Sequence, residues 1–261
     1  MLHCVYKGFV VKCGQPILQN FLLTDKMIDY QKAETTVANF PGAIKAINVT
    51  FQHSYACGAD YGTKQIQFSG KHKAYGFKTK VAVGPDGQAH YVSIPYPGLV
   101  HNMKIFCNHI DKHLERLEKG PGNDREIDNL TIEGVDKAKM WAALMDRGYQ
   151  GASKLGRFLT PKKKTAFCDL DSTNKKKNRR IEEDRVLVEN YFGRTKLLWG
   201  MAKQTFQLKD DLYDPTMAIC FALTNYHVSL LPLCNKDVMV EDNYNRRLID
   251  AYNRATKETQ N

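Results

Sequence analysis

GAIKAINVTF, residues 42–51, is the stretch of sequence that decides the fold, because apolar and β-branched residues occupy most of its positions. Pro41 interrupts the chain just before it, so the run predicts a buried β-strand. Asn48 lies near the end of this run. We expect the strand to deliver this polar side chain to one edge of a sheet.

The residues that follow predict a hairpin and then a helix. Residues 76–83 and 90–94 are rich in β-formers and flank the turn sequence Pro85-Asp86-Gly87, which predicts two antiparallel strands. Over residues 100–118, apolar side chains recur at roughly helical spacing with charges between them, which predicts an amphipathic helix.

The second half of the sequence predicts one more strand and two helices. The apolar residues 140–145 predict a short strand that ends at Asp146, although their alanines and methionines leave a helix end as the alternative. Residues 161–180 lack periodicity and predict a mobile loop, and residues 181–198 and 215–231 predict helices. This order of elements indicates an α/β fold, a mixed sheet flanked by helices.

The composition indicates a protein with a packed core that binds a polyanion. The chain has 261 residues and a net charge of +10, which suits one large domain and favours nucleic acid as a partner. No apolar stretch approaches the roughly 20 residues that cross a bilayer, and the seven cysteines form no CxxC pair. We therefore expect an intracellular protein with free thiols and no membrane contact.

Most of the positive charge lies in one part of the sequence. Residues 154–196 hold thirteen Lys and Arg against six Asp and Glu, so they contribute +7 of the +10. An ordinary solvated loop is the alternative, but we predict contact with the phosphate backbone of DNA, which depends on salt and not on sequence. The predicted DNA-binding residues are Lys71, Lys73, Lys162, Lys163, Lys164, Lys175, Lys176, Lys177, Arg179, Arg180, Arg185 and Lys196.

Three polar residues stand where separate elements would bring them to the same edge of the sheet: Asn48, Asp146 and Glu189. Cleavage of a phosphodiester by paired divalent cations needs anionic oxygens that converge from several elements. Taken singly, an aspartate before Gly-Tyr is often a turn former, and a helical glutamate is usually a solvated charge. Together they form our predicted catalytic and metal-binding set.

The surroundings of these residues resemble the DDE transposases. FPGAIKAINVTFQ is similar to the first-strand motif of that family, in which an aspartate stands at the position of Asn48. MDRGYQG resembles the aspartate-x-glycine-tyrosine motif and assigns the second carboxylate to Asp146. Arg185, Glu189 and Lys196 reproduce the spacing of an arginine-glutamate-lysine signature, which assigns the third carboxylate to Glu189.

Two further segments, FSGKHKAYGFKTKVAV and PYPGLVHNMKIF, resemble the PIF/Harbinger group of that family. The resemblance runs from about residue 40 to residue 231 and implies an RNase H-like fold that uses Mg²⁺ or Mn²⁺. The chain departs from the pattern at Asn48, at Asn102, where an aspartate is usual, and at Glu182, where some relatives have a tyrosine. Asparagine offers only a neutral oxygen, so we expect weakened cation binding and little or no strand cleavage.

The resemblance implies a transposon-derived protein that binds DNA and a divalent cation. One alternative is an active metal-dependent endonuclease in which Asn48 still ligates or another carboxylate, such as Asp60, compensates. The other is a domesticated DNA-binding or scaffold protein without catalysis or metal.

We further expect an RNase H-like domain at residues 40–235, an N-terminal extension at 1–39 and a C-terminal tail at 236–261. The resemblance also implies that the ends of the DNA element are recognised through a separate helix-turn-helix region or a partner protein. The run KKKNRR suggests a nuclear import signal. The DNA site and the oligomeric state do not follow from the sequence.

Overall fold

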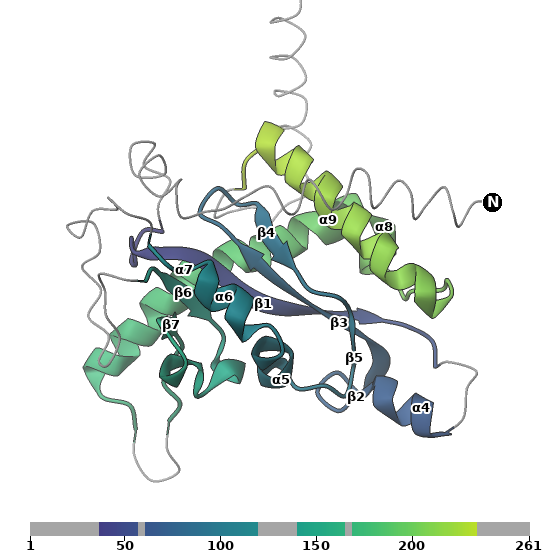
Figure 1. Ribbon diagram of the computed structural model, residues 1–261, viewed down its shortest axis with the longest axis horizontal. Helices are drawn as coiled ribbons and strands as arrows, with labels where there is room; N and C mark the ends of the chain where they lie inside the picture. Colours follow the sequence, from purple (N-terminus) through teal and green to yellow (C-terminus); the bar gives the residue numbers. More distant parts are fainter. Residues whose placement is uncertain (1–36, 57–60, 120–139, 165–168, 234–261) are drawn as a thin grey trace, which may run out of the picture.

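The fold is built around a mixed sheet of seven strands (Figure 1). The computed structural model describes residues 37–56, 61–119, 140–164 and 169–233. Within them the strands are β1 (Ala43–His53), β2 (Phe68–Ser69), β3 (Ala74–Val83), β4 (Ala89–Val92), β5 (Tyr96–Pro97), β6 (Ala142–Met145) and β7 (Phe158–Leu159).

Antiparallel and parallel pairs meet at β1, the central strand. The main path of the sheet runs β2-β3-β1-β6-β7, and both β4 and β5 pair with β3. β1 is antiparallel to β3 and parallel to β6, which in turn is parallel to β7. β3 and β4 form the predicted hairpin, so that prediction is confirmed.

β1 reads as an almost continuous apolar run because both of its faces are covered. Ala43 and Ala46 contribute to one apolar core, which also contains Val188 and Phe221. Ile47 contributes to the other core. The strand thus packs into two separate cores, and its side chains alternate between them beyond the irregularity at Ala43 and Lys45.

The helices lie on both faces of the sheet (Figure 1). One core joins the sheet to α7 and α9, and the other joins it to α5 and α6. The helices are α4 (Tyr61–Gln67), α5 (Asn102–Cys107), α6 (Ile110–Glu115), α7 (Ser172–Leu198), α8 (Gly200–Lys203) and α9 (Tyr213–Leu230), with short 3₁₀ turns at η3 (Arg147–Tyr149), η4 (Ala152–Lys154) and η5 (Asp210–Leu212). This is an α/β fold consistent with the RNase H-like class, as expected.

Two of the predicted element boundaries were wrong. α7 begins at Ser172, so the KKKNRR run is helical and not part of a loop. Asp171 caps this helix, with its side chain accepting from the backbone N–H of Asn174 at 2.7 Å. The helix predicted over residues 100–118 is interrupted, because His109 leaves the helical conformation at φ −133°.

The predicted N-terminal extension and C-terminal tail lie almost wholly outside the described residues. Residues 37–39 are the exception, and Asp184 of α7 contacts Asn39 and the first residue of the predicted domain, Phe40. Its carboxylate accepts from the backbone N–H of Asn39 and of Phe40, each at 3.0 Å. Among the described residues, no helix has the length and apolar character needed to cross a membrane.

Candidate functional site

Asn48, in the middle of β1, and Asp146, directly after the end of β6, lie side by side on two parallel strands. Ile47 of β1 is paired in register with Met145 of β6, and each polar residue comes directly after its member of that pair. Ala46 and Leu144, two residues earlier, face the core that α7 covers. Because side chains alternate along a strand, Asn48 and Asp146 point toward α7.

α7 carries Glu189 near its middle, on a polar stripe of the helix. Arg185 lies four residues before Glu189 and Lys196 lies seven residues after it, and both intervals place residues on one helical face. Phe192, three residues after Glu189, and Val188 lie directly beside this stripe and are buried against the sheet. The apolar face thus fixes the rotation of the helix and turns the polar stripe toward the edge where β6 ends.

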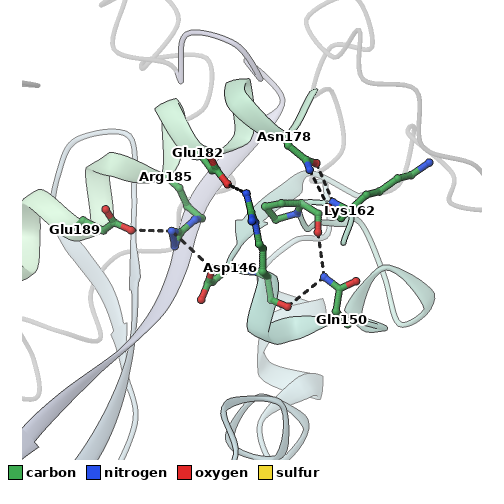
Figure 2. A network of polar contacts seen from close by, with 9 residues as sticks. Asp146, Gln150, Lys162, Asn178, Glu182, Arg185 and Glu189 are labelled. Carbon is green, nitrogen blue, oxygen red and sulfur yellow. Dashed lines mark hydrogen bonds and ion pairs between the residues drawn. The ribbon is translucent and has the colours of Figure 1, made fainter. Parts of the chain in front are cut away.

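Arg185 joins the two carboxylates (Figure 2). Its Nη2 atom lies 2.7 Å from Oε1 of Glu189 and 3.9 Å from Oδ1 of Asp146. The two carboxylate oxygens are therefore no farther apart than the sum of these distances. The Arg185 side chain is only 10% exposed, whereas those of Asp146 and Glu189 are 30% and 49% exposed.

Gly148 leaves a small space beside Asp146. A Cβ at this position would lie 3.8 Å from Oδ2 of Asp146 and 3.9 Å from Nδ2 of Asn102. Asn102, at the start of α5, therefore belongs to the surroundings of the carboxylate. Together with Asn48, it places two neutral amides and two carboxylates around this edge of the sheet.

The DRGY segment, residues 146–149, also makes contacts with its own turn, with α7 and with the core. Oδ1 of Asp146 accepts the backbone N–H of Arg147 at 2.6 Å, which caps the turn η3. The Arg147 side chain is paired with Glu182 of α7. Burial and then the nearby carboxylate of Asp146 raise the pKa of Tyr149 far above its usual range. The segment is thus tied to α7 by charge and to the core by its tyrosine.

The donor set suits one hard divalent cation better than two. Asp146 and Glu189 supply two carboxylates, and Asn48 supplies an amide oxygen that accepts the N–H of Val49 at 2.8 Å. Oxygen donors of this kind are those that Mg²⁺ and Mn²⁺ prefer. In the described part of the chain, no group of three or more His, Cys, Asp or Glu could hold a metal ion. Asp60, the carboxylate that could compensate, lies outside this part.

Most of the predicted DNA-binding residues surround the first half of α7. Asn178 connects the two basic runs, because its amide binds both the backbone N–H and the carbonyl of Lys162, each at 2.8 Å. Figure 2 shows this pair beside Asp146, Arg185 and Glu189, which we call the carboxylate cluster. The basic cluster consists of the exposed residues Lys162, Lys163, Lys164, Lys175, Lys176, Lys177, Arg179 and Arg180.

Three other predicted DNA-binding residues, Lys71, Lys73 and Lys196, lie away from this cluster. Lys71 and Lys73 are exposed in the turn between β2 and β3, and Lys196 is half-buried near the end of α7. Burial, and then Lys71 and other cations that include Lys196, lower the pKa of His72. Since α7 rises ~1.5 Å per residue, Lys196 lies roughly 30 Å along the axis from Lys175. The last predicted residue, Arg185, lies within the carboxylate cluster.

The sequence interpretation missed the roles of two residues near the site. Asn178 was hidden inside a basic run whose helical conformation was not foreseen, although a capping aspartate precedes that run. Asn102 was noted only as a departure from a motif. Its proximity to Asp146 depends on how α5 packs against η3, and local patterns do not report such packing.

The chain matches a known protein family. The model of the family described as DDE superfamily endonuclease matches residues 51–225, more than half of the chain. The matched segment includes Asp146, Glu189 and Asn102, and it begins just after Asn48. No curated protein and no solved structure matches the chain.

Proposed function

Since the chain belongs to the DDE superfamily of endonucleases, we propose that it is a transposon-derived, PIF/Harbinger-like protein that binds DNA and a divalent cation and cleaves DNA poorly or not at all. The family supports a nuclease of the transposase type. The observation that carries the finer proposal is the contact of one guanidinium with both Asp146 and Glu189. It brings together two acidic residues from different parts of the sequence.

Asp146, Glu189 and the amide oxygen of Asn48 would hold the cation. A bound divalent cation polarises the scissile phosphate and lowers the pKa of a water or hydroxyl nucleophile. The contribution of the chain is to orient the oxygens from β1, β6 and α7. The apolar cores beneath these elements fix that orientation.

Asn48 is the reason to expect impaired cleavage. A neutral amide cannot compensate the repulsion between two closely spaced divalent cations. Each 1.4 kcal/mol of lost stabilisation lowers the rate about tenfold, so the loss of a bridging anion costs on the order of 10²-fold or more. Asn102, beside Asp146, is a second neutral group in the same surroundings.

The basic cluster is the proposed contact surface for DNA. Its residues are exposed in the first turns of α7 and in the segment before it, and Asn178 holds Lys162 against that helix. Lysine and arginine side chains neutralise phosphates and release condensed counterions, so the affinity should fall steeply with salt. The contact with the DNA phosphate backbone would extend to Lys71, Lys73 and Lys196.

Nicking of supercoiled DNA with Mg²⁺ or Mn²⁺ tests the proposal. We expect little or no nicking by the natural chain and metal-dependent nicking by the Asn48→Asp variant. The additional change Glu189→Gln should abolish that gain. Continued inactivity of a folded Asn48→Asp variant, with no metal binding, would contradict the site assignment.

The two rival functions give different results in the same experiment. An active endonuclease would nick DNA without any substitution, and Glu189→Gln would abolish the activity. A non-catalytic DNA-binding or scaffold protein would bind DNA in a salt-dependent manner and show no Mn²⁺ binding by calorimetry. The neutralisation of the carboxylates by Arg185 favours this second rival over the first.

Nuclear localisation and a separate DNA-binding partner belong to the same proposal. The helical KKKNRR run is exposed apart from Asn178, so an import receptor could reach its lysines. Replacing Lys175, Lys176 and Lys177 with alanine in a fluorescent fusion should reduce nuclear accumulation. An unchanged distribution would contradict the role of the run.

A further inference from the structure

The guanidinium of Arg185 is buried but poorly satisfied by hydrogen bonds. The residue is 8% exposed, and its Nη2 atom donates to Oε1 of Glu189 at 2.7 Å. Within the described part of the chain, its Nε and Nη1 atoms are buried without a hydrogen-bond partner. Each such unmade bond costs about 1–3 kcal/mol. The side chain is therefore held in place mainly by the negative charge beside it.

That negative charge is the pair that we propose as the cation site. Two carboxylates close to one another repel unless a cation lies between them. Arg185 supplies that positive charge without any metal. A divalent cation would compete for the same two oxygens, because it requires them as ligands.

We propose that Arg185 is the internal counter-ion of Asp146 and Glu189 and that it lowers the affinity of their site for divalent cations. The inference rests on the proposed metal site. A cation can bind only as the contacts of Nη2 with the carboxylates are given up. The free energy of those contacts is thereby subtracted from that of cation binding.

A second arginine–glutamate pair on the same helix provides a matched comparison. Arg179 and Glu183 have the same four-residue spacing, with Nε and Oε1 2.8 Å apart. Their side chains are 82% and 47% exposed, so solvent screens the pair. Among the described residues, Arg179 contacts no second carboxylate. Arg179 and Glu183 therefore form an ordinary helix-surface pair, whose loss should not affect cation binding.

Calorimetric titration with Mn²⁺ alone separates the two cases. We expect Arg185→Gln to bind Mn²⁺ about tenfold more tightly than the natural chain, the change that 1.4 kcal/mol of lost competition produces. Arg179→Gln should leave the affinity unchanged. Arg185→Lys keeps the positive charge beside the carboxylates, so its increase should be smaller. Mn²⁺ should also raise the Tm of Arg185→Gln more than that of the natural chain.

The outcomes distinguish failure of this inference from failure of the proposed function. Suppose that Glu189→Gln removes Mn²⁺ binding, whereas folded Arg185→Gln and Arg185→Lys bind Mn²⁺ no more tightly than the natural chain. The metal site then stands, and the competition is refuted. If neither the natural chain nor the Arg185 variants bind Mn²⁺, both proposals are wrong.

Discussion

Asn48, within β1, and Asp146, directly after β6, stand at the same level on adjacent parallel strands and on the same face of the sheet. The register pair Ile47–Met145 directly precedes them. An aspartate at position 48 would therefore place a second negative charge beside the first. Because Asn48 is neutral, the guanidinium of Arg185 is enough to balance the negative charge of Asp146 here.

Asn48→Asp should make the stability of the protein depend on a divalent cation. We expect the free energy of unfolding without metal to fall by about 1–2 kcal/mol, the size of one pKa unit of repulsion between carboxylates. Mn²⁺ should restore it, as measured by urea denaturation with and without the cation. Gln207→Glu adds the same charge at an exposed position and should show neither effect. A folded Asn48→Asp variant that ignores Mn²⁺ would argue against the site.

Gly148→Ala should weaken cation binding without disturbing the fold. The added methyl group would lie 3.8 Å from Oδ2 of Asp146 and 3.9 Å from Nδ2 of Asn102, so it fits by ordinary contact. It would nevertheless cover the carboxylate oxygen that the turn η3 leaves open. We expect an unchanged Tm and a several-fold weaker affinity for Mn²⁺ by calorimetry.

Gly193→Ala is the matched control for that change. Gly193 lies within α7, and nothing stands within 4 Å of the position its Cβ would take. Alanine there should stabilise the helix by about 0.5–1 kcal/mol and leave the Mn²⁺ affinity as it was. Equal affinities in the two variants would show that Gly148 does not border the site.

Asp184→Ala should destabilise the domain strongly, because this carboxylate fixes residues 39 and 40 to α7. It accepts from the backbone N–H of Asn39 and of Phe40 and from the side-chain amide of Asn39 at 2.9 Å. Its loss leaves the buried N–H of Phe40 unpaired, at about 1–3 kcal/mol, and removes the partner of two half-buried donors of Asn39. We expect a loss of about 2–4 kcal/mol in urea denaturation. Glu183→Ala, at the more exposed neighbouring position, should cost less than about 1 kcal/mol.

The central elements could be predicted from the sequence because burial gives them a pattern. β1 is covered on both faces and reads as an apolar run, and Pro85-Asp86-Gly87 marks the hairpin turn. The first turns of α7 extend beyond the core. Only Asn178 is buried between Ser172 and Arg180, so no apolar period reveals the helix there. The cap at Asp171 was the available signal.

The candidate site shows the same division between local and tertiary information. Asp146 and Glu189 could be named from the sequence. Asp146 follows an apolar strand, Glu189 lies on a predicted helix, and both stand in motifs that resemble those of a known family. The pairing of Arg185 with both could not be predicted, since it depends on the rotation of α7 over the sheet. The pairing of Arg147 with Glu182 is equally a product of tertiary packing.

Lys80 lies on the face of the sheet that α5 and α6 cover, where the groups around it solvate its charge poorly. Its Nζ atom donates to the carbonyl of Ile105 at 3.3 Å and lies 5.1 Å from the ring of Tyr91 and 5.6 Å from that of Phe106. Burial lowers the pKa of Lys80 from 10.5 to about 7, and Cys107 opposes this only in part. The folded state therefore releases its proton at a lower pH than the unfolded state.

This lowered pKa predicts that the protein becomes more stable as pH rises from about 7 toward 10. In that interval the unfolded chain binds more protons than the folded one, so the free energy of unfolding increases with pH. Lys80→Met should stabilise the protein by about 1–4 kcal/mol at pH 7 and by much less at pH 10. The measurement is urea denaturation at several pH values, with the exposed Lys112→Met as the control. A gain that stayed constant with pH would show that the charge of Lys80 is not what destabilises the core.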